Sequence, residues 1–313
     1  MVNLDKSFWQ GKRVLITGHT GFKGSWLMLY LLNLGAKIWG YSLEPETEKS
    51  LFKQLNLENE LSFNKINSYK SLYSDVRDLK RLRNFVNDCQ PEIVFHLAAQ
   101  SIVLKSYTHP LETWEVNVQG TLNLLETLKS VKNFCSVIVV TTDKVYKNKS
   151  WDFGYRENDE LGGYDPYSSS KAAAEIAVSS WRSSFCGKES FQTSNLGIAT
   201  VRAGNVIGGG DWAQDRIIPD CIKSITNKKP VNIRSPKSTR PWQHVLEPIS
   251  GYLMLAQKIF EINSFENSYT SSFNFGPQQK DNRSVLDMVN EVFKYWPGEY
   301  IISSNKNAKY ESK

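Results

Sequence analysis

A glycine-rich turn near the N-terminus limits the possible folds more than any other segment. Lys12–Thr17 has the apolar sequence of a buried strand and runs directly into Gly18, Gly21 and Gly24, after which Ser25–Leu34 has the pattern of a helix. Gly18 permits a tight turn, Gly21 lets the backbone approach a pyrophosphate, and Gly24 lets helix and strand pack closely. A glycine triplet also occurs in purely structural turns. The flanking strand and helix favour a dinucleotide-binding turn, with the helix N-terminus facing the phosphates.

Apolar segments alternate with amphipathic segments from this turn to about residue 204. The further predicted strands are Ala36–Tyr41, Ile93–Leu97, Ser136–Val140 and Gly197–Arg202, and the predicted helices are Leu79–Asp88, Leu111–Lys129 and Tyr167–Ser184. Strands that alternate with helices form right-handed crossovers and a parallel sheet. We therefore predict an α/β protein with a Rossmann-type, doubly wound parallel sheet.

The regular alternation of predicted strands and helices ends after Asn205. Three glycines at 208–210 and five prolines between Pro219 and Pro248 divide this part into shorter elements. Beyond them, Pro248–Phe260 has a helical pattern and Phe273–Phe275 fits an edge strand of the main sheet. We predict a dinucleotide-binding domain of residues 1–204, to which 245–276 return, and a smaller interleaved substrate lobe of residues 205–244 and 277–313.

Charge and cysteine content exclude several classes of protein. The net charge of +6 is dispersed, with 38 Lys+Arg against 32 Asp+Glu, so it fits an anionic small substrate better than nucleic acid. Cys89, Cys135, Cys186 and Cys221 are far apart, which indicates neither a metal site nor a disulfide framework. Trp26–Leu32 is too short to span a membrane. We expect a cytoplasmic protein with no membrane partner.

The second strand ends where the adenosine ribose of a dinucleotide would lie. Ser42 follows there, and Glu44 stands 20 residues beyond Gly24, where an acidic residue binds the ribose hydroxyls of NAD. A solvated loop glutamate is the alternative for Glu44. No Arg or Lys lies between Ile38 and Glu48 to meet a 2′-phosphate, which favours NAD over NADP.

Asp75 and Val76 end the next apolar stretch and form a candidate contact for the adenine amine. The alternative for Asp75 is a structural one, as the N-cap of the following helix.

Candidate catalytic residues follow the strand at 136–140 and begin the helix at 167. The segment Thr141–Lys144 comes directly after that strand, and Tyr167 and Lys171 are four residues apart, so they share one helix face. An ammonium group close to a phenol favours the phenolate and lowers its pKa, which would make Tyr167 a usable base. A surface pair is the alternative for an isolated match of this kind.

Several motifs together resemble the extended short-chain dehydrogenase/reductases. They are the glycine turn, His96–Gln100, Asn117–Thr121 and the Tyr167/Lys171 pair. Within that group, Thr142-Asp143-Lys144 resembles the nucleotide-sugar 4,6-dehydratases. Arg202–Trp212 and Arg240–Val245 are similar to the branch that acts on CDP-glucose, and the resemblance runs from about Phe8 to about Trp296.

This resemblance implies a reaction and a role for each catalytic residue. Oxidation of C4 of the sugar makes the C5 hydrogen acidic, water leaves from C6, and the hydride returns to C6. Tyr167 takes the C4 hydroxyl proton, Lys171 tunes Tyr167 and binds the nicotinamide ribose, and Thr142 hydrogen-bonds the C4 oxygen. Asp143 protonates the departing hydroxyl, which requires a raised pKa. Lys144 stands where dTDP-glucose dehydratases carry a glutamate base; we favour electrostatic stabilisation of the enolate over a base role. A structural Asp143–Lys144 pair is the alternative.

The resemblance also implies binding residues. The predicted cofactor-binding set is Gly18, Thr20, Gly21, Phe22, Gly24, Ser42, Glu44, Asp75, Val76, Ala98, Ala99, Gln100, Asn117, Tyr167 and Lys171. The predicted substrate-binding set is Lys105, Asn205, Arg216, Arg240, Trp242 and His244, in which Asn205 and Arg240 lie near the diphosphate of a nucleotide sugar. Core packing is the alternative for Trp242, and a solvated loop position is the alternative for Lys105.

Other expectations concern assembly and the C-terminus. The apolar faces of Leu111–Lys129 and Tyr167–Ser184 suit a homodimer, although burial within one protomer explains part of the pattern. Family chains usually continue beyond the region near Trp296, whereas this one ends in the polar tail Asn305–Lys313, so the substrate lobe is expected to be shortened.

The competing functions are an NAD-dependent nucleotide-sugar 4-epimerase or reductase, and a catalytically silent cofactor-binding protein.

Overall fold

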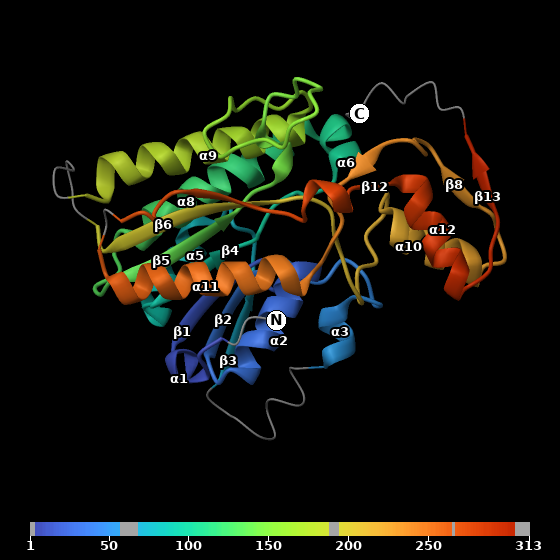
Figure 1. Ribbon diagram of the computed structural model, residues 1–313. Coiled ribbons are helices and arrows are strands. Elements are labelled where there is room, and N and C mark those ends of the chain that lie inside the picture. Colours follow the sequence, from blue (N-terminus) through green and yellow to red (C-terminus); the bar gives the residue numbers. More distant parts are fainter. Residues whose placement is uncertain (1–3, 57–67, 188–193, 265–266, 304–313) are drawn as a thin grey trace.

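A seven-stranded parallel sheet forms the centre of the molecule (Figure 1). The computed structural model describes residues 4–56, 68–187, 194–264 and 267–303. The strand order is β11-β6-β5-β4-β1-β2-β3. The bounds are β1 Arg13–Thr17, β2 Lys37–Ser42, β3 Tyr69–Tyr73, β4 Ile93–His96, β5 Cys135–Val140, β6 Leu196–Ala203 and β11 Ser272–Phe275. The predicted Rossmann-type fold class is confirmed, and so is the edge strand at 273–275.

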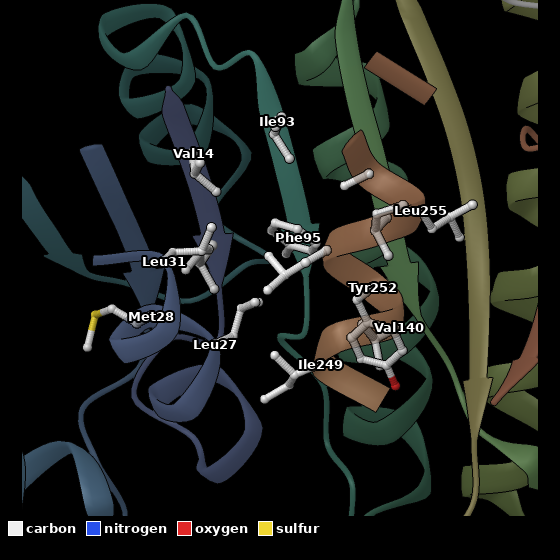
Figure 2. Close-up of a cluster of buried hydrophobic side chains, with 14 of the residues drawn as sticks. Val14, Leu27, Met28, Leu31, Ile93, Phe95, Val140, Ile249, Tyr252 and Leu255 are labelled. Carbon is white, nitrogen blue, oxygen red and sulfur yellow. The ribbon is translucent and has the colours of Figure 1, made fainter. Parts of the chain in front are cut away.

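Helices cover both faces of this sheet (Figure 1). One face carries α2 (Phe22–Asn33) and α11 (Leu246–Ile262), and the other carries α5 (Leu79–Cys89), α8 (Gly120–Leu128) and α9 (Pro166–Phe185). Successive strand residues point to opposite faces, so Val14 and Ile16 pack in the core beneath α2 while Leu15 packs in the other core. Figure 2 shows how apolar side chains of α2 and α11 fill the first of these cores. Within the described residues, no helix is both long and apolar enough to cross a bilayer.

The predicted helix 111–129 is interrupted by a wider turn. It consists of α7 (Pro110–Trp114), a π-helical turn (Glu115–Gln119) and α8. In the π turn, buried Asn117 accepts a hydrogen bond from the amide of Gln100 (2.9 Å) and donates one to its carbonyl (3.0 Å). Single π turns of this kind depend on tertiary contacts, which the periodicity of the sequence does not reveal.

Short elements beyond β6 form a smaller lobe. Three two-stranded sheets pair β7 (Val206–Ile207) with β10 (Gln243–His244), β9 (Thr239–Arg240) with β12 (Arg283–Ser284), and β8 (Val231–Ile233) with β13 (Tyr300–Ile302). Helices α10 (Ile217–Thr226) and α12 (Val285–Tyr295) pack with β8 around Cys221, Val231, Ile233 and Val289. The division into domains stays a prediction, and the tail Asn305–Lys313 lies outside the described residues.

The remaining short elements lie near the ends of the strands. They are α1 (Lys6–Trp9), α3 (Leu51–Leu55), α6 (Val103–Thr108) and the 3-10 turns Asp143–Val145 and Gln279–Asp281. From β1 the chain winds outward through β2 and β3, and then continues on the other side of β1 with β4. Open α/β sheets bind ligands at the carboxyl ends of the strands where the order reverses in this way.

Candidate active site

A cleft of about 770 Å³ lies at the carboxyl ends of the strands. Its walls come from the glycine turn, the segment after β5, the start of α9 and the smaller lobe. Most of the predicted site residues line it: Gly18, Thr20, Gly21, Phe22, Gly24, Ser42, Glu44, Asp75, Val76, Ala98, Ala99, Thr142, Asp143, Lys144, Tyr167, Lys171, Asn205, Arg216, Arg240 and Trp242. The described residues contain no group of three or more His, Cys, Asp or Glu side chains arranged to hold a metal ion.

The glycine turn is shaped for the close approach of a ligand to the backbone. Gly18 has φ +77°, and a Cβ there would lie 2.7 Å from the amide nitrogen of Ala98. A Cβ on Gly24 would overlap the carbonyl oxygen of Gly18. The N-cap of α2 is Gly21, which has no side chain to bond the first turn, so the N–H groups of that turn are left for an anion in the cleft. This turn fits the pyrophosphate of a dinucleotide.

Polar side chains continue this wall toward the adenosine end. The Thr20 hydroxyl bonds with that of Ser42 (2.7 Å) and donates to the carbonyl of Leu43 (2.9 Å). Asp75 is ion-paired with Arg77 at 2.7 Å, and Arg77 holds the pKa of that carboxyl below its usual range.

The N-cap of α5 is Asp78, which accepts from the amide of Arg81 at 3.0 Å. The alternative interpretation of Asp75 as that cap is therefore wrong.

Helix α9 and the end of β5 form the wall of the cleft that carries the candidate catalytic residues, called the catalytic wall below. The Asp165 side chain caps α9 by accepting from the amide of Ser168 (2.9 Å), which places Tyr167 and Lys171 on the face toward β5. Both are buried, with 8% and 6% of their surface exposed. The Lys171 ammonium donates to the carbonyl of Val140 at 3.2 Å.

The pKa of Tyr167 differs from the prediction. Burial raises the pKa of Tyr167 to about 12; a hydrogen bond with Thr142 lowers it and the charge of Asp143 raises it further. Burial also lowers the pKa of Lys171 to about 8. The predicted lowering of the tyrosine pKa is wrong for this structure, because desolvation outweighs the favourable interactions of the phenol.

Asp143 lies between Thr142 and Gly204 on the wall of the cleft. Burial raises the pKa of its carboxyl, against opposing effects of Lys144 and a hydrogen bond with Thr142. The Thr142 hydroxyl donates to Asp143 Oδ1 at 3.1 Å. The other carboxyl oxygen, Oδ2, lies next to Gly204, where a Cβ would be only 3.1 Å away. A residue larger than glycine would therefore crowd this carboxyl group.

Cationic side chains reach the cleft from the smaller lobe. Arg216 is ion-paired with Asp211 at 3.1 Å, and Arg234 with Asp215 at 3.3 Å. Arg240 lies on β9. Arginines held in this way suit the recognition of phosphate oxygens.

The sequence interpretation missed several residues of this cleft, chiefly Lys23, Asp211, Asp215 and Arg234. Burial lowers the pKa of Lys23 to about 8. The Lys23 ammonium group also interacts electrostatically with Arg216 and Asp143. A lysine inside the glycine turn itself is a signal that could have identified Lys23. Asp211 lies within the motif Arg202–Trp212, which is the signal for that residue, whereas the positions of Asp215 and Arg234 depend on how the smaller lobe folds.

Comparison with known proteins agrees with this geometry. The family model described as GDP-mannose 4,6 dehydratase matches residues 15–277. The chain is 49% identical to CDP-glucose 4,6-dehydratase of Salmonella typhimurium over 94% of this chain and 79% of that protein. It is 31% identical to dTDP-D-glucose 4,6-dehydratase of Dictyostelium discoideum over 82% of this chain and 58% of that protein. The chain belongs to the nucleotide-sugar 4,6-dehydratase family.

Solved structures share the fold of this family member. The dTDP-glucose 4,6-dehydratase DesIV of Streptomyces venezuelae, determined with NAD bound, has a TM-score of 0.74 at 17% identity and covers 96% of this chain and 86% of its own. MoeE5, in complex with UDP-glucose and NAD, has a TM-score of 0.72 at 23% identity over 94% of this chain and 86% of its own.

Two predicted cofactor residues of the dehydratase lie behind the cleft wall. Gln100 donates from its side chain to Thr113 (2.9 Å), and Asn117 donates to the hydroxyl of Ser170 (2.9 Å) and to the backbone of Gln100. Both side chains are buried and bonded within the protein. In this structure they link the π turn to α9 and do not line the cleft.

Two predicted substrate residues of the dehydratase also lie outside the cleft. Lys105 forms an ion pair with Glu112 at 3.7 Å. His244 is exposed, packs edge-on against Trp26, and accepts at Nδ1 from the amide of Leu246 (3.3 Å). The following residue, Val245, is fully buried, and its inward position leaves His244 on the outer side of the chain.

Proposed function

We propose that this protein converts CDP-glucose to CDP-4-keto-6-deoxyglucose, with tightly held NAD. The observation that carries the proposal is the half-buried Asp143 beside Thr142, with its pKa raised, in the same cleft as Tyr167 and Lys171. Oxidation at C4 requires a base, and removal of water requires an acid, and this cleft contains a candidate for each. The choice of CDP-glucose is supported by the 49% identity with the Salmonella enzyme.

NAD fits the wall formed by the glycine turn. Gly18, Gly21 and the first turn of α2 would hold its pyrophosphate, and Ser42 and Glu44 would lie at the adenosine ribose. When bound, NAD supplies a hydride acceptor that takes hydrogen from C4 and later returns it to C6.

Tyr167 is the proposed base for oxidation. It would take the proton of the C4 hydroxyl, while Thr142 hydrogen-bonds the C4 oxygen. Because burial raises the pKa of Tyr167 to about 12 in this structure, the phenolate requires cationic stabilisation as it forms. Lys171 is the proposed source of that stabilisation, held on the same wall by the Val140 carbonyl.

Asp143 is the proposed acid for elimination. The 4-ketone makes the C5 hydrogen acidic, and transfer of that proton to the neutral amine of Lys144 would give an enolate from which the C6 hydroxyl leaves. Asp143 would protonate this leaving group, and Lys144 would stabilise the enolate. Arg216, Arg240 and Asn205 are proposed to bind the diphosphate.

We also propose a homodimer. Large apolar side chains are exposed on α7 and α9, among them Leu111 (77%), Trp114 (40%) and Ile176 (59%), and burial against a second copy would remove them from water. The cytoplasmic location stays a prediction from the sequence.

Incubation with CDP-glucose tests the proposed activity. We expect the purified protein, supplied with NAD, to form a product with the alkaline absorbance of a 4-keto-6-deoxy sugar. The dTDP-, GDP- and UDP-glucose substrates, assayed in parallel, should turn over at least about tenfold less efficiently if the chain shares the specificity named for its 49% identical relative. A 4-epimer as product would support the epimerase instead, and the absence of any product despite bound NAD would support a silent binding protein.

Gly24→Ala should weaken NAD binding at least about tenfold and lower the free energy of unfolding by about 1–3 kcal/mol. The added methyl group would overlap the Gly18 carbonyl and force apart the turn and α2. Calorimetric titration with NAD and thermal unfolding measure the two effects. Gly209→Ala is the matched control, since a Cβ there has nothing within 4 Å. Equal NAD affinity in the two variants would contradict the proposed fit of the turn.

A further inference from the structure

A buried ion pair lies behind the catalytic wall, and the proposed chemistry does not use it. Glu175 of α9 and Arg202 of β6 are 2% and 3% exposed. Arg202 donates from Nε to Glu175 Oε1 (3.0 Å) and from Nη2 to Oε2 (2.9 Å), and from Nη1 to the Tyr146 hydroxyl (2.7 Å). Removing two charges from water is expensive, and buried pairs often add little net stability. Stability alone therefore does not account for this pair behind the catalytic wall.

One face of α9 is bonded to three consecutive residues at the end of β5. The hydroxyl of Tyr167 interacts with that of Thr142, Lys171 donates to the carbonyl of Val140, and Glu175 accepts from the hydroxyl of Thr141. The helix residues are spaced by four, so they lie in one row along the helix. Glu175 thus extends the row of catalytic residues by one turn and holds the residue immediately before Thr142.

Arg202 connects the same carboxylate to the segment after the catalytic loop. Tyr146 follows the turn Asp143–Val145, and its hydroxyl accepts from Arg202 and donates to Asn274 (2.6 Å). The carboxylate and its partner therefore hold the Thr142–Lys144 loop at both ends. Charge acts here as well, because the carboxylate of Glu175 opposes the loss of the proton from Lys171.

We infer that Glu175, paired with Arg202, is a positioning residue that holds the Thr142–Lys144 loop against the Tyr167–Lys171 face of α9. This inference rests on the proposed function for its kinetic consequences, but not for the state of Lys171. Among the described residues, Lys23 of α2 and His96 of β4 also interact electrostatically with Lys171, and Asp143 of the 3-10 turn and Tyr167 of α9 line the same cleft.

Two matched variants separate positioning from stability. Thr141→Val and Thr200→Val each remove one hydroxyl that donates to Glu175, but Thr200 lies within β6, away from the catalytic loop. We expect kcat for CDP-glucose to fall at least about tenfold in Thr141→Val, with KM changed less than about twofold, because misplacement of reacting groups lowers the rate more than binding. Thr200→Val should keep the wild-type kcat. Equal values of kcat in the two variants would overturn the inference.

A second measurement needs no turnover. Acetylation of Lys171 is measured against pH by peptide mass spectrometry, on the protein without added cofactor. The resulting curve gives the titration midpoint of the Lys171 amine. We expect that midpoint to shift downward by about one pH unit in Glu175→Gln/Arg202→Met, which removes both buried charges and leaves neither unpaired. An unchanged midpoint in the folded double variant would overturn the electrostatic part. If the double variant does not fold, the two threonine variants decide. If the wild type turns over no nucleotide sugar, the proposed function fails, while the midpoint still tests the inference.

Discussion

Tyr167→Phe is expected to lower the turnover of CDP-glucose about a thousandfold. The substitution removes only the hydroxyl, which is the group that accepts the C4 proton and interacts with Thr142. Without it, oxidation at C4 has no base, so neither elimination nor hydride return can follow. Because the ring that fills the wall remains, NAD affinity should stay within about twofold of the wild type. Steady-state kinetics and calorimetric titration measure these quantities.

Tyr164→Phe is the matched control for this variant. Tyr164 lies three residues before Tyr167 and is 90% exposed, so loss of its hydroxyl should leave turnover unchanged. If Tyr167→Phe kept more than about a tenth of the wild-type turnover, Tyr167 would not be the base. The raised pKa of Tyr167 would then reflect only the packing of this wall and would have no bearing on catalysis.

Asp143→Asn should block elimination while oxidation continues. The amide has nearly the shape of the carboxyl but cannot protonate a leaving hydroxyl, so we expect product formation to fall about 100- to 1000-fold. Oxidised sugar and reduced cofactor should then accumulate on the protein in a single turnover. The near-ultraviolet absorbance of NADH follows the oxidation, and anion-exchange chromatography follows the product.

The pH dependence of this variant provides a further check. Burial raises the pKa of Asp143, and the acid form is the active one, so wild-type elimination should decline as the pH rises through that pKa. Asp143→Asn should lack this decline. Asp152→Asn, at an exposed position away from the cleft, serves as the control. Wild-type turnover in Asp143→Asn would rule out the acid role.

The chemistry of the cleft was predictable where it depends on a motif. The glycine turn and the Thr142–Lys144 triplet are contiguous, and the Tyr167–Lys171 pair spans one helical turn, so local spacing alone brings their members together. The smaller lobe was not predictable in this way. Its strand β8 pairs with β13, about 70 residues later in the chain, and neither strand exceeds three residues. Such short segments have too few residues for their periodicity to be recognised.

The sequence by itself determined the parallel sheet, the dinucleotide turn and the candidate base Tyr167 beside Lys171, because these follow from residue type and local periodicity, whereas the role of Asp143 as candidate acid came from the resemblance to a family. Only the tertiary structure decided which side chains share the cleft, as Lys23 does and His244 does not. It also decided the raised pKa of Tyr167 and the pairing of Glu175 with Arg202. These properties depend on burial and on contacts between distant segments. The free energy of ionising a side chain depends on its burial and its neighbours in the folded protein, and these cannot be read from the spacing of residues along the chain.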